Sequence, residues 1–274
     1  MEDFIKHTKN DDDNKWERER LSGQHDVMMA AMGDPIYAPL DFSEPGLRII
    51  DSGTADGCWI LHMRSLYPVK HEYVGTDIDE ALYPDPAPEG TRFQNQSIHD
   101  AFPTDWAESF DLVHQRLVMA AAPPQTIAAV VSRLAGLLKP GAWMQLVEVD
   151  IDSVPENGPA LKQFLHFAQS MSSFSGMGPN LAKELVGAMR DAGLTGVEER
   201  SVDILHGKSN PNPELKQKST ESLCGAVPPL VQGVKMMLPN EFTEDANNLQ
   251  AQLRKELSEE GGKTKIRVVW GQKA

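Results

Sequence analysis

A small turn at residues 51–57 is the first place where residue types and spacing predict chemistry. The segment IIDSGTADG leaves an apolar, β-branched run at Asp51 and enters a helical pattern after Gly57. Gly53 permits a tight turn with positive φ, and Gly57 allows the helix to begin close to a ligand. We expect Ala55, between them, to adopt a negative φ. The turn predicts that the edge of a bound ligand lies against it, although small residues also occur in purely structural strand-to-helix turns.

Asp77 narrows the predicted ligand to one that contains adenosine. It stands twenty residues after Gly57, near the end of the strand-like segment YVGTDID. A carboxylate at the end of the second strand can accept hydrogen bonds from both ribose hydroxyls, in nicotinamide enzymes and in S-adenosylmethionine enzymes. The pairing of turn and carboxylate therefore predicts an adenosine site without identifying the cofactor.

The turn itself favours S-adenosylmethionine over a dinucleotide. Ala55 and Cys58 occupy positions where a dinucleotide fingerprint has glycine. Asp56 adds a carboxylate to the same turn. A carboxylate repels a pyrophosphate and attracts an ammonium or sulfonium group. We therefore predict a methyl donor as the cofactor, with a nicotinamide oxidoreductase as the alternative from another enzyme class.

Composition argues against several classes of partner. The 274 residues carry 26 basic and 40 acidic side chains, a net charge of −14, which argues against nucleic acid. No apolar run is long enough to cross a membrane and the opening segment is acidic and polar, so we expect a cytoplasmic protein without a membrane partner. The two cysteines, Cys58 and Cys224, have neither disulfide-framework nor zinc spacing. The acidic run at 11–13 is expected to be solvated, so no metal site is predicted.

Apolar periodicity alternates between strand and helix, which predicts an α/β fold with a mostly parallel, doubly wound sheet. We expect residues 1–15 to be a disordered leader and residues 16–274 to form a single domain. Strands are expected at 47–51, 72–77, 92–95, 110–114, 142–148 and 196–204, and in the closing segment KIRVVWGQK. Helices are expected at 16–33, 57–66, 126–138, 179–192 and 242–257. Two further helical segments, at about 155–178 and 208–239, interrupt the alternation and are predicted to form a lid.

Several segments together resemble the fungal secondary-metabolism branch of class I S-adenosylmethionine-dependent methyltransferases. They are the RL…QH pattern from Arg20 to His25, IIDSGTADGCWILHMRSLYP, YVGTDID, SFDLVHQRLVMAA, LAGLLKPGAWMQLVEVDI and RVVWGQK. Within that branch, the chain length and lid segments resemble methyltransferases of gliotoxin-type (epidithiodioxopiperazine) pathways, including the dithiol S-methyltransferase. The resemblance implies a seven-stranded Rossmann-like sheet of order 3-2-1-4-5-7-6, with strand seven antiparallel, and S-adenosyl-L-methionine as cofactor.

The resemblance also implies roles for residues at matching positions. Those expected beside the methionine part of the cofactor are Gly53, Thr54 and Gly57, with Asp77 on the ribose and Ile78 on the adenine. Those expected at the adenine edge are Gln96, Ser97 and Ile98, where many family members carry an acidic residue at one of the first two positions. Those expected near the methionine part and the transfer centre are His114, Gln115 and Arg116. Arg20 is expected to pair with the cofactor carboxylate, and His25 to line the same cleft.

The chemistry of methyl transfer guides the choice of acceptor. It is an in-line displacement in which alignment lowers much of the barrier, so a dedicated base is optional. Because a thiol is already partly ionised near neutral pH, the leading hypothesis is bis-S-methylation of a hydrophobic, gliotoxin-type dithiol. His25 and His114 are the candidate bases, and Glu148 is interpreted as a solvated strand end. The apolar residues expected on the lid are Phe164, Phe167, Met171, Phe174, Met177, Met236 and Met237.

Two alternatives stay open at this stage. One is N-methylation of an amide or amine in a related pathway, because the motifs locate the donor and say little about the acceptor. The other is a methyltransferase-fold regulator of secondary metabolism, which binds the donor and protein partners without turning over a small molecule.

Overall fold

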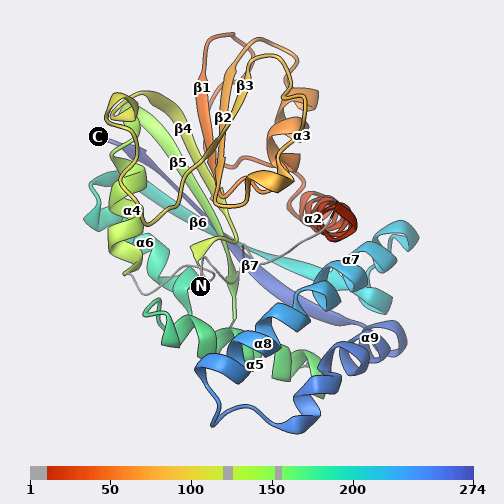
Figure 1. The fold of residues 1–274 in the computed structure, drawn as a ribbon. Coiled ribbons are helices and arrows are strands. Elements are labelled where there is room, and N and C mark those ends of the chain that lie inside the picture. The colour runs from red at the N-terminus through yellow and green to blue at the C-terminus, as the bar shows by residue number, and fades with distance from the viewer. Residues whose placement is uncertain (1–10, 120–125, 152–155) are drawn as a thin grey trace.

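The protein is built on one sheet of seven strands, as the computed structural model shows for residues 11–119, 126–151 and 156–274 (Figure 1). The strand order is β3-β2-β1-β4-β5-β7-β6. Strand β7 runs antiparallel to β5 and β6, and the other neighbouring strands are parallel. The predicted fold class and strand order are therefore confirmed. In chain order the strands are β1 Arg48–Ser52, β2 Glu72–Asp77, β3 Thr91–Asn95, β4 Phe110–Arg116, β5 Leu138–Asp150, β6 Leu194–His206 and β7 Gly262–Lys273.

The parallel strands bring the predicted site residues to one edge of the sheet. Ile49 and Ile50 of β1 are completely buried, as expected for a central strand covered on both faces. In the register, Ser52 lies beside Thr76 of β2 and Gln115 of β4. The turn that follows β1 therefore lies between the carboxyl ends of β2 and β4, the usual ligand position in a doubly wound sheet.

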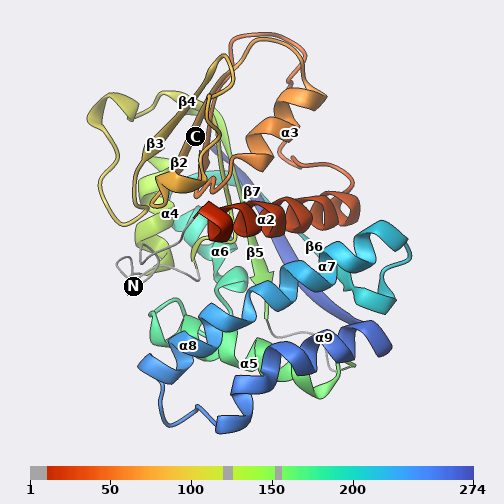
Figure 2. The ribbon, with the colours of Figure 1, turned by 45° about the vertical axis from the view of Figure 1, so that its right-hand side comes forward.

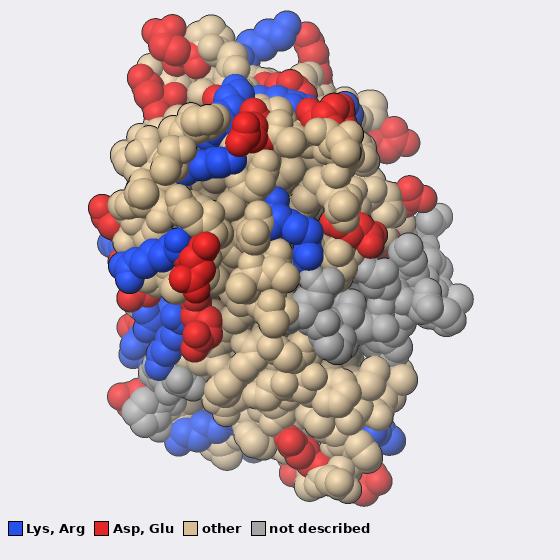
Figure 3. Space-filling model, turned by 90° about the vertical axis from the view of Figure 1, so that its left-hand side faces the viewer, with Lys and Arg blue, Asp and Glu red and all other residues tan. Residues whose placement is uncertain are grey.

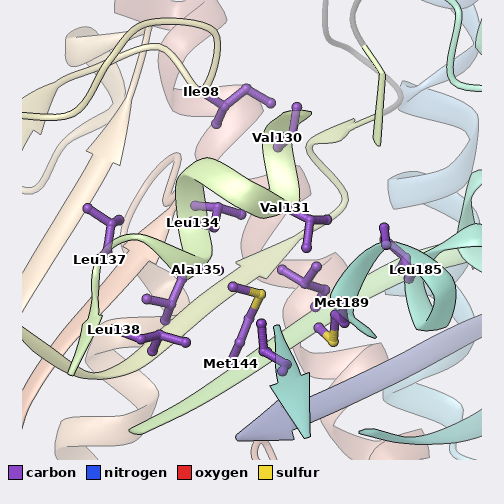
Figure 4. Packing of buried hydrophobic residues seen from close by; sticks show 14 of the residues in the cluster. Ile98, Val130, Val131, Leu134, Ala135, Leu137, Leu138, Met144, Leu185 and Met189 are labelled. Carbon is purple, nitrogen blue, oxygen red and sulfur yellow. The ribbon is translucent and has the colours of Figure 1, made fainter. Parts of the chain in front are cut away.

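Helices cover both faces of this sheet (Figure 1). Helices α4 and α6 lie on one face, where Val131 and Leu134 of α4 and Met189 of α6 pack with Met144 of β5 (Figure 4). Helix α3 lies on the other face over β1, and α2 packs there on the antiparallel end of the sheet through Met28. In chain order the helices are α2 Asp11–Met32, α3 Cys58–Leu66, α4 Ile127–Ala135, α5 Pro159–Phe174, α6 Leu181–Asp191, α7 Pro213–Gly225, α8 Val227–Met237 and α9 Leu249–Glu259.

Four helices, α5, α7, α8 and α9, gather beyond the carboxyl end of β5 (Figure 2). They share a core of their own, in which Leu161 and Phe167 of α5 pack with Cys224 of α7 and Leu253 of α9. Helix α7 also packs along α2 (Figure 2). The segments expected to be helical therefore contain helix α5 in the first and helices α7 and α8 in the second, and α7 joins them through α2 to the edge of the sheet that carries the turn.

Local boundaries differ from the expectations at several places, and the largest difference is at helix α9, which begins at Leu249 although the helix was expected from residue 242. Helix α2 begins at Asp11, five residues before the expected start of order at Trp16, and residues 1–10 of the expected leader lie outside the described part. Strand β5 begins at Leu138, four residues before the expected start at 142, because Leu138 already pairs with Phe110 of β4.

The expected aromatic and methionine wall of the lid is largely wrong. Phe167 and Met177 are buried in two separate cores, whereas Phe174 and Met236 are 45% and 56% exposed. Phe164 lines a cavity next to the end of β5, the second cavity of the functional site described below. Periodicity predicted the helices, but it did not predict which of their faces meets the rest of the molecule.

The surface and the helices give two further findings. On the face in Figure 3, acidic and basic side chains are interspersed over a mainly uncharged surface. Among the described residues, no helix is both long enough and apolar enough to cross a membrane.

Candidate functional site

A cavity of 340 Å³ lies where the turn after β1 meets the carboxyl ends of β2 and β4. Its lining includes most of the residues predicted to bind the methyl donor: Arg20, Gly53, Thr54, Asp77, Ile78, Ser97, Ile98 and Arg116. Gln96 and Asp56 line it as well. Four predicted site residues, His25, Gly57, His114 and Gln115, are not part of the lining. We call this space the donor cavity.

Gly53 holds the floor of the donor cavity close to the sheet. Its φ is 74°, and its N–H donates to the carbonyl of Thr76 at 2.7 Å. A Cβ at this position would lie 2.1 Å from Cγ2 of Val118, so no larger residue fits without displacing the side chain of Val118. The prediction of a tight turn with positive φ at Gly53 is confirmed.

The other two small residues of the turn behave differently from the expectation. Gly57 has a φ of 72°, but a Cβ there would lie 2.9 Å from the ring of Phe93, so this glycine serves close packing below the turn. Ala55 has a φ of 50°, in the left-handed region, where we expected a negative value. Its N–H donates to Oδ2 of Asp77 at 2.8 Å, and this bond holds the strained conformation.

Asp77 connects the turn to the end of β2. Besides the bond from Ala55, its Oδ1 accepts hydrogen bonds from the N–H groups of Ile78 at 2.8 Å and Asp79 at 3.1 Å. Burial raises the pKa of Asp77, and these three bonds oppose the rise. The carboxylate is thus held at a fixed orientation on the cavity wall, where it can accept hydrogen bonds from a ligand.

Arg116 reaches the donor cavity from the end of β4 and is held by His25, which in turn contacts His62. Its Nη1 and Nη2 both lie 3.2 Å from Nδ1 of His25, and Nε2 of His25 lies 2.9 Å from Nδ1 of His62. Because arginine can only donate, Nδ1 of His25 carries the lone pair and Nε2–H donates to His62. Burial and the positive charge of Arg116 lower the pKa of His25 to about 3. His25 therefore stays neutral with both nitrogens occupied, which fits positioning of Arg116 instead of the predicted role as a base.

His114, the other predicted base, lies behind the cavity. It is 1% exposed, its Nδ1 lies 2.7 Å from Oδ1 of Asp51, and its ring stacks on Trp59 at a centroid distance of 3.9 Å. Burial lowers the pKa of His114, against the effect of Asp51. Gln115 is buried too, and it accepts a hydrogen bond from Ser52. Both residues support the cavity wall and do not reach a ligand within it.

The mouth of the donor cavity carries charges of both signs. Arg20 of α2 is paired with Glu17 through two contacts of 2.8 Å, and a Cβ on Gly225 of α7 would lie 2.5 Å from its Cδ. Burial raises the pKa of Asp56 and raises that of Cys58 to about 12, so the Cys58 thiol stays protonated. None of the described residues form a cluster of three or more His, Cys, Asp or Glu side chains that could hold a metal ion.

A second cavity of 210 Å³ adjoins the first, and sequence reasoning missed most of its wall. Gln24, Leu117 and Ala226 line both spaces. The rest of the wall comes from α2, β5, α5, α6, β6, α7 and β7 and is mainly apolar, and we call this space the acceptor cavity. Glu148 lines it and is 2% exposed, so the interpretation of Glu148 as a solvated strand end is wrong. Helices α5 and α7 cover this end of β5, and no local sequence pattern signals that cover.

Similarity to known proteins agrees with this geometry. Residues 24–199 match the family model described as a methyltransferase domain. The methyltransferase psoC of Aspergillus fumigatus is 39% identical, over 89% of this chain and 89% of that protein. The N-methyltransferase sirN of Leptosphaeria maculans is 36% identical, over 94% and 92% of the two chains. The N-methyltransferase gliN of A. fumigatus is 33% identical, over 94% and 93%.

The fold also matches solved structures. Phosphoethanolamine N-methyltransferase 2 of Haemonchus contortus, in complex with S-adenosyl-L-methionine, superposes with a TM-score of 0.59 at 14% identity. The match covers 99% of this chain and 59% of that one, so this chain spans less than two thirds of the solved structure. At this level of identity the likeness concerns the fold alone.

Proposed function

This chain belongs to the S-adenosylmethionine-dependent methyltransferase family, and on that premise we propose that it methylates a nitrogen atom of a small, apolar molecule of fungal secondary metabolism. The observation that carries the choice of nitrogen is the similarity to sirN and gliN. Both are named N-methyltransferases, and each is matched over 94% of this chain. S-methylation of a dithiol, the leading hypothesis from the sequence, is the competing proposal.

The donor cavity has the chemical groups that S-adenosylmethionine requires. Asp77 offers a fixed carboxylate for the ribose hydroxyls, and Arg116 offers a cation for the donor's carboxylate. Asp56 is an acidic neighbour for its ammonium or sulfonium group. The hydroxyl oxygen of Thr54 is buried and has no hydrogen-bond partner among the described residues. These features fit the cofactor.

The arrangement of the two cavities supports in-line transfer. When bound, the donor supplies an electrophilic methyl group. Leu117 and Gln24 belong to both cavities, so a ligand in one reaches a ligand in the other past these two side chains. The wall of the acceptor cavity is mainly apolar, which suits an apolar acceptor held in line with the donor. Such alignment lowers a barrier by as much as about 7–11 kcal/mol in the best intramolecular cases.

The acceptor atom is tested with compounds that share one apolar ring. 2-Naphthylamine, 2-acetamidonaphthalene, 2-naphthalenethiol and 2-naphthol are each incubated with the protein and S-adenosylmethionine carrying a trideuterated methyl group. Mass spectrometry then reports which compound gains the label, with protein-free samples correcting for spontaneous transfer. We expect labelling of a nitrogen compound. Labelling of the thiol alone supports S-methylation instead, and donor binding without labelling of any compound supports the regulator hypothesis.

A further inference from the structure

We propose that Glu148 is the polar anchor of the acceptor cavity, where one carboxylate oxygen accepts a hydrogen bond from the N–H of the acceptor and takes up the proton that methyl transfer releases. This inference rests on the proposed N-methylation. It adds the residue that recognises the acceptor and the path of the proton.

The chain after β4 holds the Glu148 carboxylate in place. Oε1 accepts hydrogen bonds from the N–H groups of Val118 and Met119, each at 3.0 Å. Leu117, just before them, has a φ of 57° and contributes to the wall between the two cavities. The carboxylate is therefore fixed beside the residue that a transferred methyl group must pass. No described residue provides a hydrogen-bond partner for the other oxygen, Oε2.

Another buried glutamate shows what a structural role requires. Glu256 of α9 uses both of its carboxylate oxygens, accepting from the N–H groups of Ala160 at 2.8 Å and Leu161 at 3.0 Å at the start of α5. Glu148 is buried more completely, at 2% against 8% exposure, but its bonds to described residues involve Oε1 alone. Since a buried carboxylate is costly unless its oxygens are bonded, the second oxygen of Glu148 is suited to a ligand.

The neighbouring charged residues Arg267 and His206 do not neutralise the negative charge of the Glu148 carboxylate. Arg267 stands opposite it in the β5–β7 register but pairs with Asp150 and Glu199. His206, the other titratable residue on the cavity wall, bonds Thr264 through Nε2 at 2.8 Å, and burial lowers its pKa to about 4. Burial raises the pKa of Glu148 to about 7. Near neutral pH its carboxylate form is therefore accessible and basic enough to accept a proton.

The transfer step balances with Glu148 as proton acceptor. The nitrogen lone pair forms the new N–CH₃ bond, while the electrons of the broken S–CH₃ bond stay on sulfur, which becomes a neutral thioether. The proton on nitrogen passes to Oε2, so that the carboxylate becomes a carboxylic acid, and this acid later releases the proton to solvent. A thiolate acceptor carries no proton to release and makes no such demand on Glu148.

Binding of an isosteric pair tests the anchor without turnover. 2-Naphthylamine and 2-methylnaphthalene differ in whether an N–H can reach Glu148. Their affinities are measured by calorimetry with S-adenosylhomocysteine bound, for the wild-type protein, Glu148→Gln and the exposed control Glu198→Gln. The glutamine keeps an oxygen for Val118 and Met119 but replaces the accepting oxygen by a donor. We expect Glu148→Gln to lower the affinity for 2-naphthylamine by at least about tenfold. Its affinities for 2-methylnaphthalene and S-adenosylhomocysteine should equal those of the wild type, and Glu198→Gln should bind all three compounds like the wild type.

Each other outcome decides between the anchor and the proposed function. The inference that Glu148 anchors the acceptor is refuted if Glu148→Gln loses affinity for both naphthalenes equally. It is also refuted if the wild type and Glu148→Gln bind the amine with equal affinity. If N-methylation is nevertheless observed, the proposed function stands without it. Failure of the wild-type protein to bind either naphthalene contradicts the apolar acceptor cavity, and with it the anchor. For the proton step, single-turnover rates on the amine should fall by about a hundredfold or more in Glu148→Gln, and rates unchanged at all pH values refute proton uptake.

Discussion

The burial of Glu148 predicts a pH dependence of stability that the replacement Glu148→Gln should remove. The pKa of Glu148 rises from an ordinary value of 4.5 to about 7, mainly because burial disfavours the charged form. One pKa unit corresponds to about 1.4 kcal/mol, so the rise corresponds to about 3 kcal/mol. Above pH 4.5 the unfolded chain loses this proton while the folded chain keeps it, so the wild type loses stability as the pH rises to about 7.

The assay is urea unfolding of both proteins over this pH range. The free energy of unfolding of Glu148→Gln minus that of the wild type should grow by about 3 kcal/mol as the pH rises, and should be constant above about pH 7. Other titrating groups cancel in the difference, and Glu198→Gln, which removes an exposed carboxylate, serves as the control. A difference that is constant from pH 4.5 upwards, or that shrinks as the pH rises, refutes the burial argument.

Three further replacements test other parts of the account. Ala55→Gly should raise the free energy of unfolding by about 1 kcal/mol, since left-handed strain of about 1–2 kcal/mol exceeds the added chain entropy of glycine; a decrease in urea unfolding contradicts the strain. Leu223→Trp, which fills the acceptor cavity, should raise the acceptor KM by about tenfold or more and leave the affinity for S-adenosylhomocysteine unchanged. If the affinities for acceptor and S-adenosylhomocysteine fall together, the two ligands do not occupy separate cavities. His25→Gln, which can still accept from Arg116, should keep the pH profile of kcat, because the pKa of His25 is already about 3. Loss of an acidic limb from that profile would identify His25 as the base.

Much of the fold and the donor cavity could be predicted from the sequence because both depend on local patterns. The apolar run at Ile49 and Ile50 marks a central strand, and the spacing from Gly57 to Asp77 places two strand ends together. The left-handed Ala55 was missed because its conformation depends on the N–H bond to Asp77 across the turn. A single-residue pattern carries no such information.

The acceptor cavity was harder to predict because it depends on packing between distant segments. Glu148 stands at the end of a strand, where solvation is the usual outcome, but α5 and α7 cover it. Phe174 and Met236 follow helical spacing and still face solvent. The segment 208–239, predicted from the sequence to form a lid, carries the buried core residues Cys224 and Val227, so its helices are also part of the core.

The most direct test of the account is the affinity of S-adenosylhomocysteine for the wild-type protein and for Asp77→Ala, measured by calorimetry. The donor cavity is defined by the carboxylate of Asp77 at the end of β2, and loss of hydrogen bonds to a charged group should weaken binding by about tenfold or more. Circular dichroism verifies that the variant is folded under the conditions of the titration. Equal affinity in the two folded proteins would contradict the placement of the methyl donor on which the account depends.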